Sequence, residues 1–140
     1  MSQPIWQFEH SIECEASAGS AWKYWTDVAN WNDPLAEFAL VGPFEAGSRI
    51  VTKMPGQDPW QSVITEVIPD RAATIEMRLQ GAVLSFRWLF EALPEHRSRI
   101  TQRLTLDGPN AAEFLEHMAQ FERSVPDGMK VVKAAIEQGV

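Results

Sequence analysis

The stretch SAWKYWTDVANWNDP, residues 20–34, places three tryptophans within a single short segment of the chain. Ser17, which precedes it, is a good helix N-cap, and the apolar residues that follow recur at the spacing of one helical face: Ala18, Ala21, Trp22, Trp25 and Val28. We expect the helix to end over residues 29–34, because Pro34 disfavours helical geometry just before it. So much aromatic surface on a short helix needs an apolar surface to pack against.

That surface is predicted from the segments on both sides of the helix. Residues 5–14, IWQFEHSIEC, alternate in character, which is typical of a half-buried strand. Trp6, Phe8, His10, Ile12 and Cys14 fall on one face of it. Six further segments rich in β-branched and aromatic residues end at turn residues: 35–42, 48–54, 60–68, 72–80, 82–93 and 98–108. Strands joined by such short turns predict an antiparallel meander.

After this series the period changes to that of a helix, over residues 111–137. The apolar stripe consists of Ala111, Phe114, Leu115, Met118 and Phe121, and it continues after Pro126 with Met129, Val132 and Ile136. Because Pro126 lacks a backbone donor, we expect a break or kink near residues 124–127 and hence two helical pieces.

Together these elements predict one α+β domain over residues 1–140. A seven-stranded antiparallel sheet with one apolar face needs a cover, and a long C-terminal helix crossing its concave face supplies one. The sheet would then curve around that helix, with the short helical segment inserted between strands 1 and 2. Where sheet and helix do not meet, a cavity is expected.

The chain resembles the START-like (SRPBCC) superfamily of helix-grip proteins, and specifically its polyketide cyclase/dehydratase-like branch. The resemblance covers nearly the whole chain and is sharpest at Ala21-Trp22, Thr26-Asp27-Val28, Trp31, Gly42-Pro43-Phe44 and Gly47-Ser48. The superfamily also includes plant lipid and hormone carriers and activators of a heat-shock chaperone ATPase. Relatives commonly carry a second Trp shortly after the first, where this chain has Asn32, Asp33 and Pro34. The resemblance therefore implies a fold more than a particular chemistry.

Composition limits the partners. The net charge is −7 and the pI is near 4.9, which disfavours nucleic acids and anionic membrane surfaces as partners.

The single cysteine, Cys14, excludes an intrachain disulfide. Neither a signal peptide nor a membrane-spanning stretch is evident, so a cytoplasmic protein without membrane insertion is expected. The sequence leaves open whether it is a monomer or a homodimer. The three histidines lack metal-ligand spacing and no phosphate-binding loop is present, so we expect no metal and no cofactor.

Two polar residues stand out among apolar neighbours. His10 lies between Phe8 and Ile12 on the apolar strand face, and Gln102 shares a face with Ile100 and Leu104. Because an unpaired buried amide costs about 1–3 kcal/mol in proteins, Gln102 should have a partner or reach a cavity. His10 is either an inert core histidine or a polar anchor in an apolar pocket.

The aromatic and sulfur-containing candidates carry the same ambiguity. Either Trp25 packs the short helix onto the sheet and Trp31 fills the turn, or one of the two faces the mouth of the cavity and contacts the ligand. The flexible Met118 fits either the core or a ligand site. The full set of candidate ligand-binding residues is His10, Trp25, Trp31, Phe86, Trp88, Phe90, Gln102, Phe114 and Met118.

The predicted function is the binding of a small, largely apolar molecule between sheet and C-terminal helix, as in polyketide cyclase-like proteins. One alternative is an enzyme that performs acid–base chemistry, cyclisation or dehydration, in the same cavity, with His10 as the acid or base. Another is an interaction module like the chaperone activators, which would use the convex face of the sheet. The sequence identifies no catalytic group and leaves open whether the protein is an enzyme.

Overall fold

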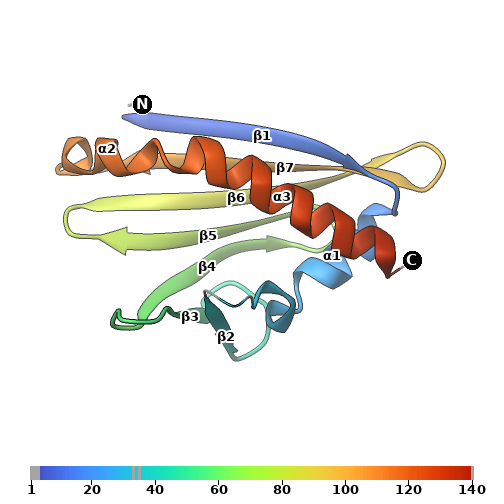
Figure 1. The fold of residues 1–140 in the computed structure, drawn as a ribbon, viewed down its shortest axis with the longest axis horizontal. Coiled ribbons are helices and arrows are strands. Elements are labelled where there is room, and N and C mark those ends of the chain that lie inside the picture. Colours follow the sequence, from blue (N-terminus) through green and yellow to red (C-terminus); the bar gives the residue numbers. More distant parts are fainter. Residues whose placement is uncertain (1–3, 33, 35, 140) are drawn as a thin grey trace.

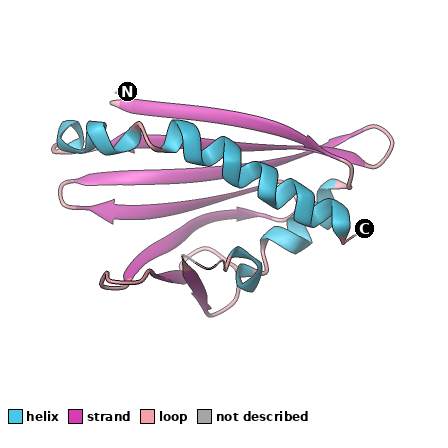
Figure 2. Ribbon diagram, in the orientation of Figure 1, coloured by secondary structure: helices cyan, strands magenta, loops and turns pink. Residues whose placement is uncertain are grey.

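The computed structural model describes residues 4–32, 34 and 36–139, and its strands form one curved, seven-stranded antiparallel sheet (Figures 1 and 2). The strand order is β1-β7-β6-β5-β4-β3-β2, so β2 to β7 form a meander and β1 pairs with the last strand. The strands are β1 (Trp6–Cys14), β2 (Glu37–Val41), β3 (Arg49–Lys53), β4 (Trp60–Ile68), β5 (Ala72–Leu79), β6 (Ala82–Leu93) and β7 (Arg97–Asp107). The predicted fold is confirmed: the strand boundaries agree with the expected ones to within two residues, and those of β4 and β6 coincide with them. The strand expected over 35–42 begins at a residue outside the described ones.

Side chains alternate between two faces of the sheet, as the sequence predicts. We call the face turned towards the helices the inner face. In β1 every second residue from Trp6 to Cys14 lies on it, and the residues between are exposed. The outer face carries cross-strand ion pairs, including Arg103–Glu9 at 2.7 Å and Arg87–Glu66 at 3.2 Å.

The short helical region after β1 consists of α1 (Ala18–Trp25) and the 3-10 helix η1 (Val28–Trp31). Ser17 caps α1 as expected, since its Oγ accepts a hydrogen bond of 3.1 Å from the backbone N–H of Ser20. The Trp31 indole donates a 2.7 Å hydrogen bond to the carbonyl of Trp25. This bond fastens η1 to the end of α1.

The C-terminal region corrects one expectation. It contains the 3-10 helix η2 (Ala111–Phe114), the short α2 (Leu115–Met118) and the long α3 (Phe121–Gln138). The prediction of a break near residues 124–127 was wrong, because Pro126 lies inside α3. The helical region is interrupted earlier, at Ala119 and Gln120. Proline removes only its own backbone donor, and burial of Val125 and Met129 on either side of it stabilises the continuous helix.

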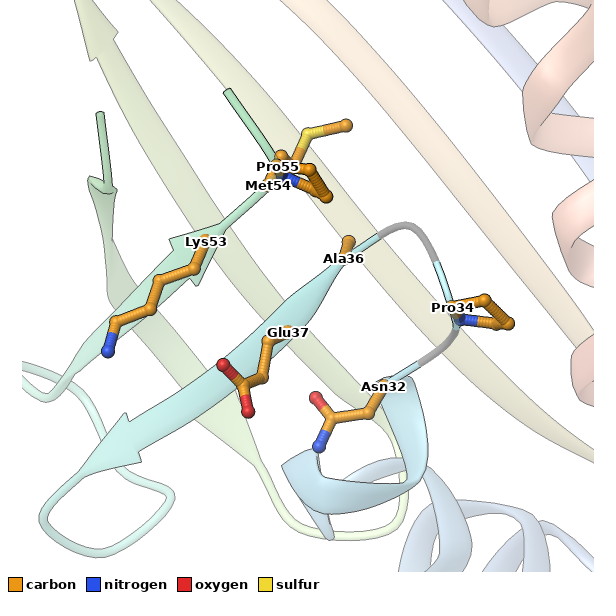
Figure 3. A pocket seen from close by; sticks show the side chains of 7 residues that line it. All are labelled: Asn32, Pro34, Ala36, Glu37, Lys53, Met54 and Pro55. Carbon is orange, nitrogen blue, oxygen red and sulfur yellow. The ribbon is translucent and has the colours of Figure 1, made fainter. Parts of the chain in front are cut away.

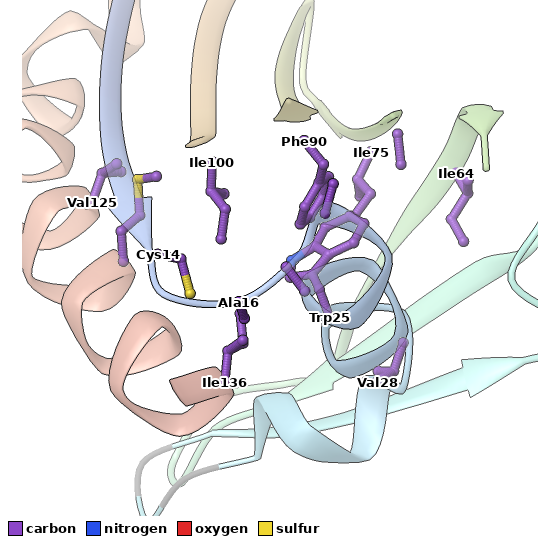
Figure 4. Packing of buried hydrophobic residues seen from close by; sticks show 14 of the residues in the cluster. Cys14, Ala16, Trp25, Val28, Ile64, Ile75, Phe90, Ile100, Val125 and Ile136 are labelled. Atoms are coloured by element: carbon purple, nitrogen blue, oxygen red, sulfur yellow. The ribbon is translucent and has the colours of Figure 1, made fainter. Parts of the chain in front are cut away.

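Packing between sheet and helices forms two apolar clusters. The main cluster lies under α1 and α3 and includes Ile64, Ile100 and Leu104, which are almost completely buried (Figure 4). A second cluster joins the sheet to η2 and α2 through Leu84, Leu106 and Met118. α3 packs chiefly on β1, whereas α1 packs on β6 and β7. The helices therefore approach the sheet at different places.

Candidate functional site

Trp25 lies at the centre of an aromatic group under α1. It is only 2% exposed, and five rings surround it at centroid distances of 5.0 to 5.9 Å: Trp88, Phe44, Phe90, Trp31 and Trp22. Phe90 is similarly buried, at 4%. Both residues were predicted as ligand contacts, and in this structure their rings pack in the core (Figure 4).

Trp31 lies at the edge of the same group. Its ring contacts Trp25 on one side and Phe38 of β2 on the other, at 5.4 and 5.7 Å, and it stays half-buried. Its indole N–H already bonds the Trp25 carbonyl. Trp31 can therefore offer a ring face or edge to another molecule, but its indole N–H is not available as a hydrogen-bond donor.

His10 and Gln102 are brought together by the strand register. His10 lies opposite Gln102 in the β1–β7 pair, and Gln102 lies opposite Trp88 in the β6–β7 pair. Within the described part of the chain, neither the imidazole nor the amide has a hydrogen-bond partner. Gln102 is only 8% exposed, but its amide is not among the fully buried unpaired atoms. His10 and Trp88 are half-buried. We call these three residues, all on the inner face, the polar row.

The other predicted residues divide between the two clusters. Phe86 lies two residues before Trp88 on the same face of β6, and its half-buried ring contacts Phe121 of α3 at a centroid distance of 5.9 Å. Phe114 and Met118 belong instead to the second cluster with η2 and α2. Seven of the nine candidates thus belong to the aromatic group, the polar row or the adjoining Phe86.

Some inner-face polar residues were not predicted as site residues. Thr52 and Ser62 are buried on β3 and β4, and Ser98 is fully buried opposite Cys14. In the described residues, Ser98 Oγ is a buried side-chain atom without a hydrogen-bond partner. The alternation of SRIVTKM and WQSVITEVI could have indicated the first two, because Thr52 shares a face with Ile50 and Ser62 with Ile64.

A pocket of about 490 Å³ lies away from the polar row, between the chain that follows η1 and the end of β3 (Figure 3). Glu37 and Lys53, which oppose each other in the β2–β3 register, lie on its wall. The other lining residues are Asn32, Pro34, Ala36, Met54 and Pro55. A smaller hollow of about 360 Å³ adjoins Gln7, Phe8, Glu9 and Arg103. None of the nine predicted site residues lines either space.

Two titrating groups are perturbed near the C-terminal end of α3. Burial, and secondarily the carboxylate of Glu137, raises the pKa of the Cys14 thiol, which keeps it protonated and a poor nucleophile. The backbone N–H of Glu15, at 2.8 Å, and then Lys133, at 3.4 Å, lower the pKa of Glu137. The Glu137 carboxylate thus joins the end of α3 to the segment after β1.

The described residues contain neither a metal-binding cluster nor a membrane-spanning helix. No group of three or more His, Cys, Asp or Glu side chains in residues 4–32, 34 and 36–139 is arranged to hold a metal ion. Over the same residues, no helix has the length and apolar character needed to cross a membrane.

A curved antiparallel sheet folded around a long C-terminal helix defines the helix-grip class of proteins. Within that class, the chain belongs to the family described as polyketide cyclase / dehydrase and lipid transport, whose family model matches residues 6–137. Among curated proteins, none matches the chain significantly.

Solved structures of the same fold are similar at low sequence identity. A norcoclaurine synthase point mutant from Thalictrum flavum, in complex with a transition state analogue, is 12% identical, with a TM-score of 0.76 and 99% of each chain covered. The Zhui aromatase/cyclase from Streptomyces sp. R1128 is 18% identical, with a TM-score of 0.75 over 95% of this chain and 94% of that one. A protein from Nitrosomonas europaea is 12% identical, with a TM-score of 0.73 and 95% of each chain covered. At these identities the likeness supports the fold alone.

Proposed function

We propose that the protein binds a small, largely apolar molecule between the inner face of its sheet and α3. The observation that carries this proposal is that large aromatic side chains of the inner face stay half-buried although they are turned towards the helices. These are Trp6, Phe8, Phe86 and Trp88. Aromatic surface of this kind, left partly open beside a few polar groups, is what small-molecule sites offer to a ligand.

The arrangement of the helices supports the same proposal. α3 packs chiefly on β1, and α1 packs on β6 and β7. The polar row spans β1, β7 and β6, so it lies where the sheet passes from one helix to the other. Trp88 and Phe86 would supply apolar contact there, and His10 and Gln102 would orient the ligand. The family description, which names lipid transport beside cyclase and dehydrase, is consistent with such a ligand.

The experiment is native mass spectrometry of the protein purified from its source cells without denaturation. We expect a fraction of the protein to carry one small organic molecule that is released into organic solvent. Protein that carries nothing, and that also fails to bind an apolar reporter dye, would contradict the proposal.

A second candidate is an enzyme with cyclase-like acid–base chemistry at the same place. It is favoured by the imidazole of His10, a side chain of the type most often used for general acid–base catalysis, which lies on the inner face directly opposite an amide. The fold neighbours include proteins named as an aromatase/cyclase and a synthase.

Incubation of the extracted molecule with the protein and with His10→Phe distinguishes the two functions. Conversion by the unchanged protein but not by the variant would establish the enzyme. Recovery of an unaltered molecule from both would favour simple binding.

A further inference from the structure

The charged residues of the sheet all lie on one side. In the seven strands as described, every charged residue occupies an outer-face position by alternation and register. These residues are Glu9, Glu13, Glu37, Arg49, Lys53, Glu66, Glu76, Arg78, Arg87, Glu91, Arg97, Arg99, Arg103 and Asp107. The inner face therefore presents only uncharged apolar and polar groups and the imidazole of His10.

The helices that cover this face add little charge to it. The residues of α1 and α3 that are buried against the sheet include Trp25, Val125, Met129 and Ile136. Lys133 and Glu137 lie near Cys14, at the end of β1, and pair with each other at 3.4 Å. Glu137 also accepts the Glu15 backbone N–H. Both charges are therefore already neutralised by these partners, and both lie away from the polar row.

This distribution of charge limits which ligands the inner face can bind. A carboxylate moved from water into such surroundings loses its hydration and finds no arginine or lysine among the described inner-face strand positions, which is a large penalty. A hydroxyl group loses far less, and it needs one donor and one acceptor. Gln102 offers both through its amide, and imidazole nitrogens can also do so.

We propose that the ligand is a neutral molecule whose hydroxyl group binds between His10 and Gln102, with its hydrocarbon body against Trp88 and Phe86. The proposal rests on the proposed function and sharpens it, because it separates alcohols and phenols from carboxylates such as fatty acids. His10 and Gln102 then determine specificity for the polar end of the ligand.

Three probes that share one ring system test this: naphthalene, 2-naphthol and 2-naphthoate, each measured by equilibrium dialysis. A neutral hydrogen bond contributes about 0.5–1.5 kcal/mol net, so we expect 2-naphthol to bind about 2- to 13-fold more tightly than naphthalene. We expect 2-naphthoate to bind more weakly than 2-naphthol.

The variants His10→Phe and Gln102→Leu should each remove much of the preference for 2-naphthol over naphthalene. Gln7→Leu is the matched control, since Gln7 lies on the same strand as His10 but is exposed on the outer face. It should change none of the three affinities. Circular dichroism checks that each variant folds, and either inner-face variant alone is sufficient for the test.

The possible failures are distinguishable. If 2-naphthoate binds as tightly as 2-naphthol, the neutral-ligand inference is wrong. If naphthalene and 2-naphthol bind equally and the variants have no effect, binding stands but His10 and Gln102 do not anchor a hydroxyl. If none of the probes binds, the proposed function fails and this inference fails with it.

Discussion

Trp25 and Trp88 have ring centroids only 5.0 Å apart, yet they belong to different environments. Trp25 is enclosed by aromatic rings from α1, η1, β6 and the loop before β3, and is 2% exposed. Trp88 has Trp25 on one side and the unpaired amide of Gln102 as its neighbour on β7, and it stays half-buried. The same sheet face thus forms a closed core under α1 and an incompletely covered surface beside it. The difference arises from the covering elements, not from the strand sequence.

The largest expected effect tests whether the aromatic group around Trp25 is a closed core. Trp25→Ala should lower the free energy of unfolding by about 3–5 kcal/mol, the usual cost of removing a large buried aromatic. Urea midpoints measure it, with Trp60→Ala, a half-buried tryptophan outside this aromatic group, as the control. A loss no greater than that of Trp60→Ala would show that the group under α1 is not a closed core.

Trp31→Ala tests the boundary between the two environments. Because Trp31 is half-buried, the expected loss of stability is smaller, about 2 kcal/mol including its bond to the Trp25 carbonyl. If Trp31 borders the binding surface, the same variant should bind an apolar reporter dye more weakly. A loss as large as that of Trp25→Ala, with unchanged dye binding, would assign both rings to the core alone.

Ser98→Ala tests whether the inner face near Cys14 is free of bound water and ligand. Its hydroxyl is fully buried without a partner in the described residues, so removing it should leave stability unchanged or raise it by up to about 1 kcal/mol. Thermal unfolding of the variant beside Ser85→Ala, on the outer face of β6, gives the comparison. Destabilisation by more than the control would mean that Ser98 bonds a water or a ligand.

The smallest effect concerns the attachment of α3. The pKa of Glu137 is lowered in the folded state, so its contribution to stability is fully present above its ordinary value of 4.5 and is lost as pH falls through the folded value. Glu137→Gln should therefore flatten the dependence of the urea midpoint on pH in the acidic range. An unchanged pH dependence would show that the bond to Glu15 does not hold in solution.

The fold was predictable because its signals are local. Alternation in residues 5–14, turn residues between the later segments and the switch to helical period each depend on neighbours in sequence. The proline signal misled because local propensity favoured a break at Pro126, whereas burial of Val125 and Met129 keeps α3 continuous. Tertiary packing therefore overrode a local preference.

The site was less predictable because its geometry depends on pairing over long sequence distances. His10 and Gln102 were each recognised as polar residues on apolar faces, but their adjacency follows from the register between the first and last strands. The irregularity in β4 between Ile64 and Glu66 likewise shifts which later residues face inward, and no residue type in the sequence predicts it. The closure around Trp25 depends on rings contributed by several separate elements.

The central claim, that a small molecule binds at the polar row, is tested most directly by nuclear magnetic resonance. A ¹H–¹⁵N spectrum resolves tryptophan indoles and glutamine side-chain amides, and Gln102→Leu and Trp88→Phe assign the two signals of interest. On titration with 2-naphthol, we expect the largest shifts at the Trp88 indole and the Gln102 amide. Shifts concentrated at Asn32 and Lys53, which line the pocket between η1 and β3, with Gln102 and Trp88 unchanged, would contradict it.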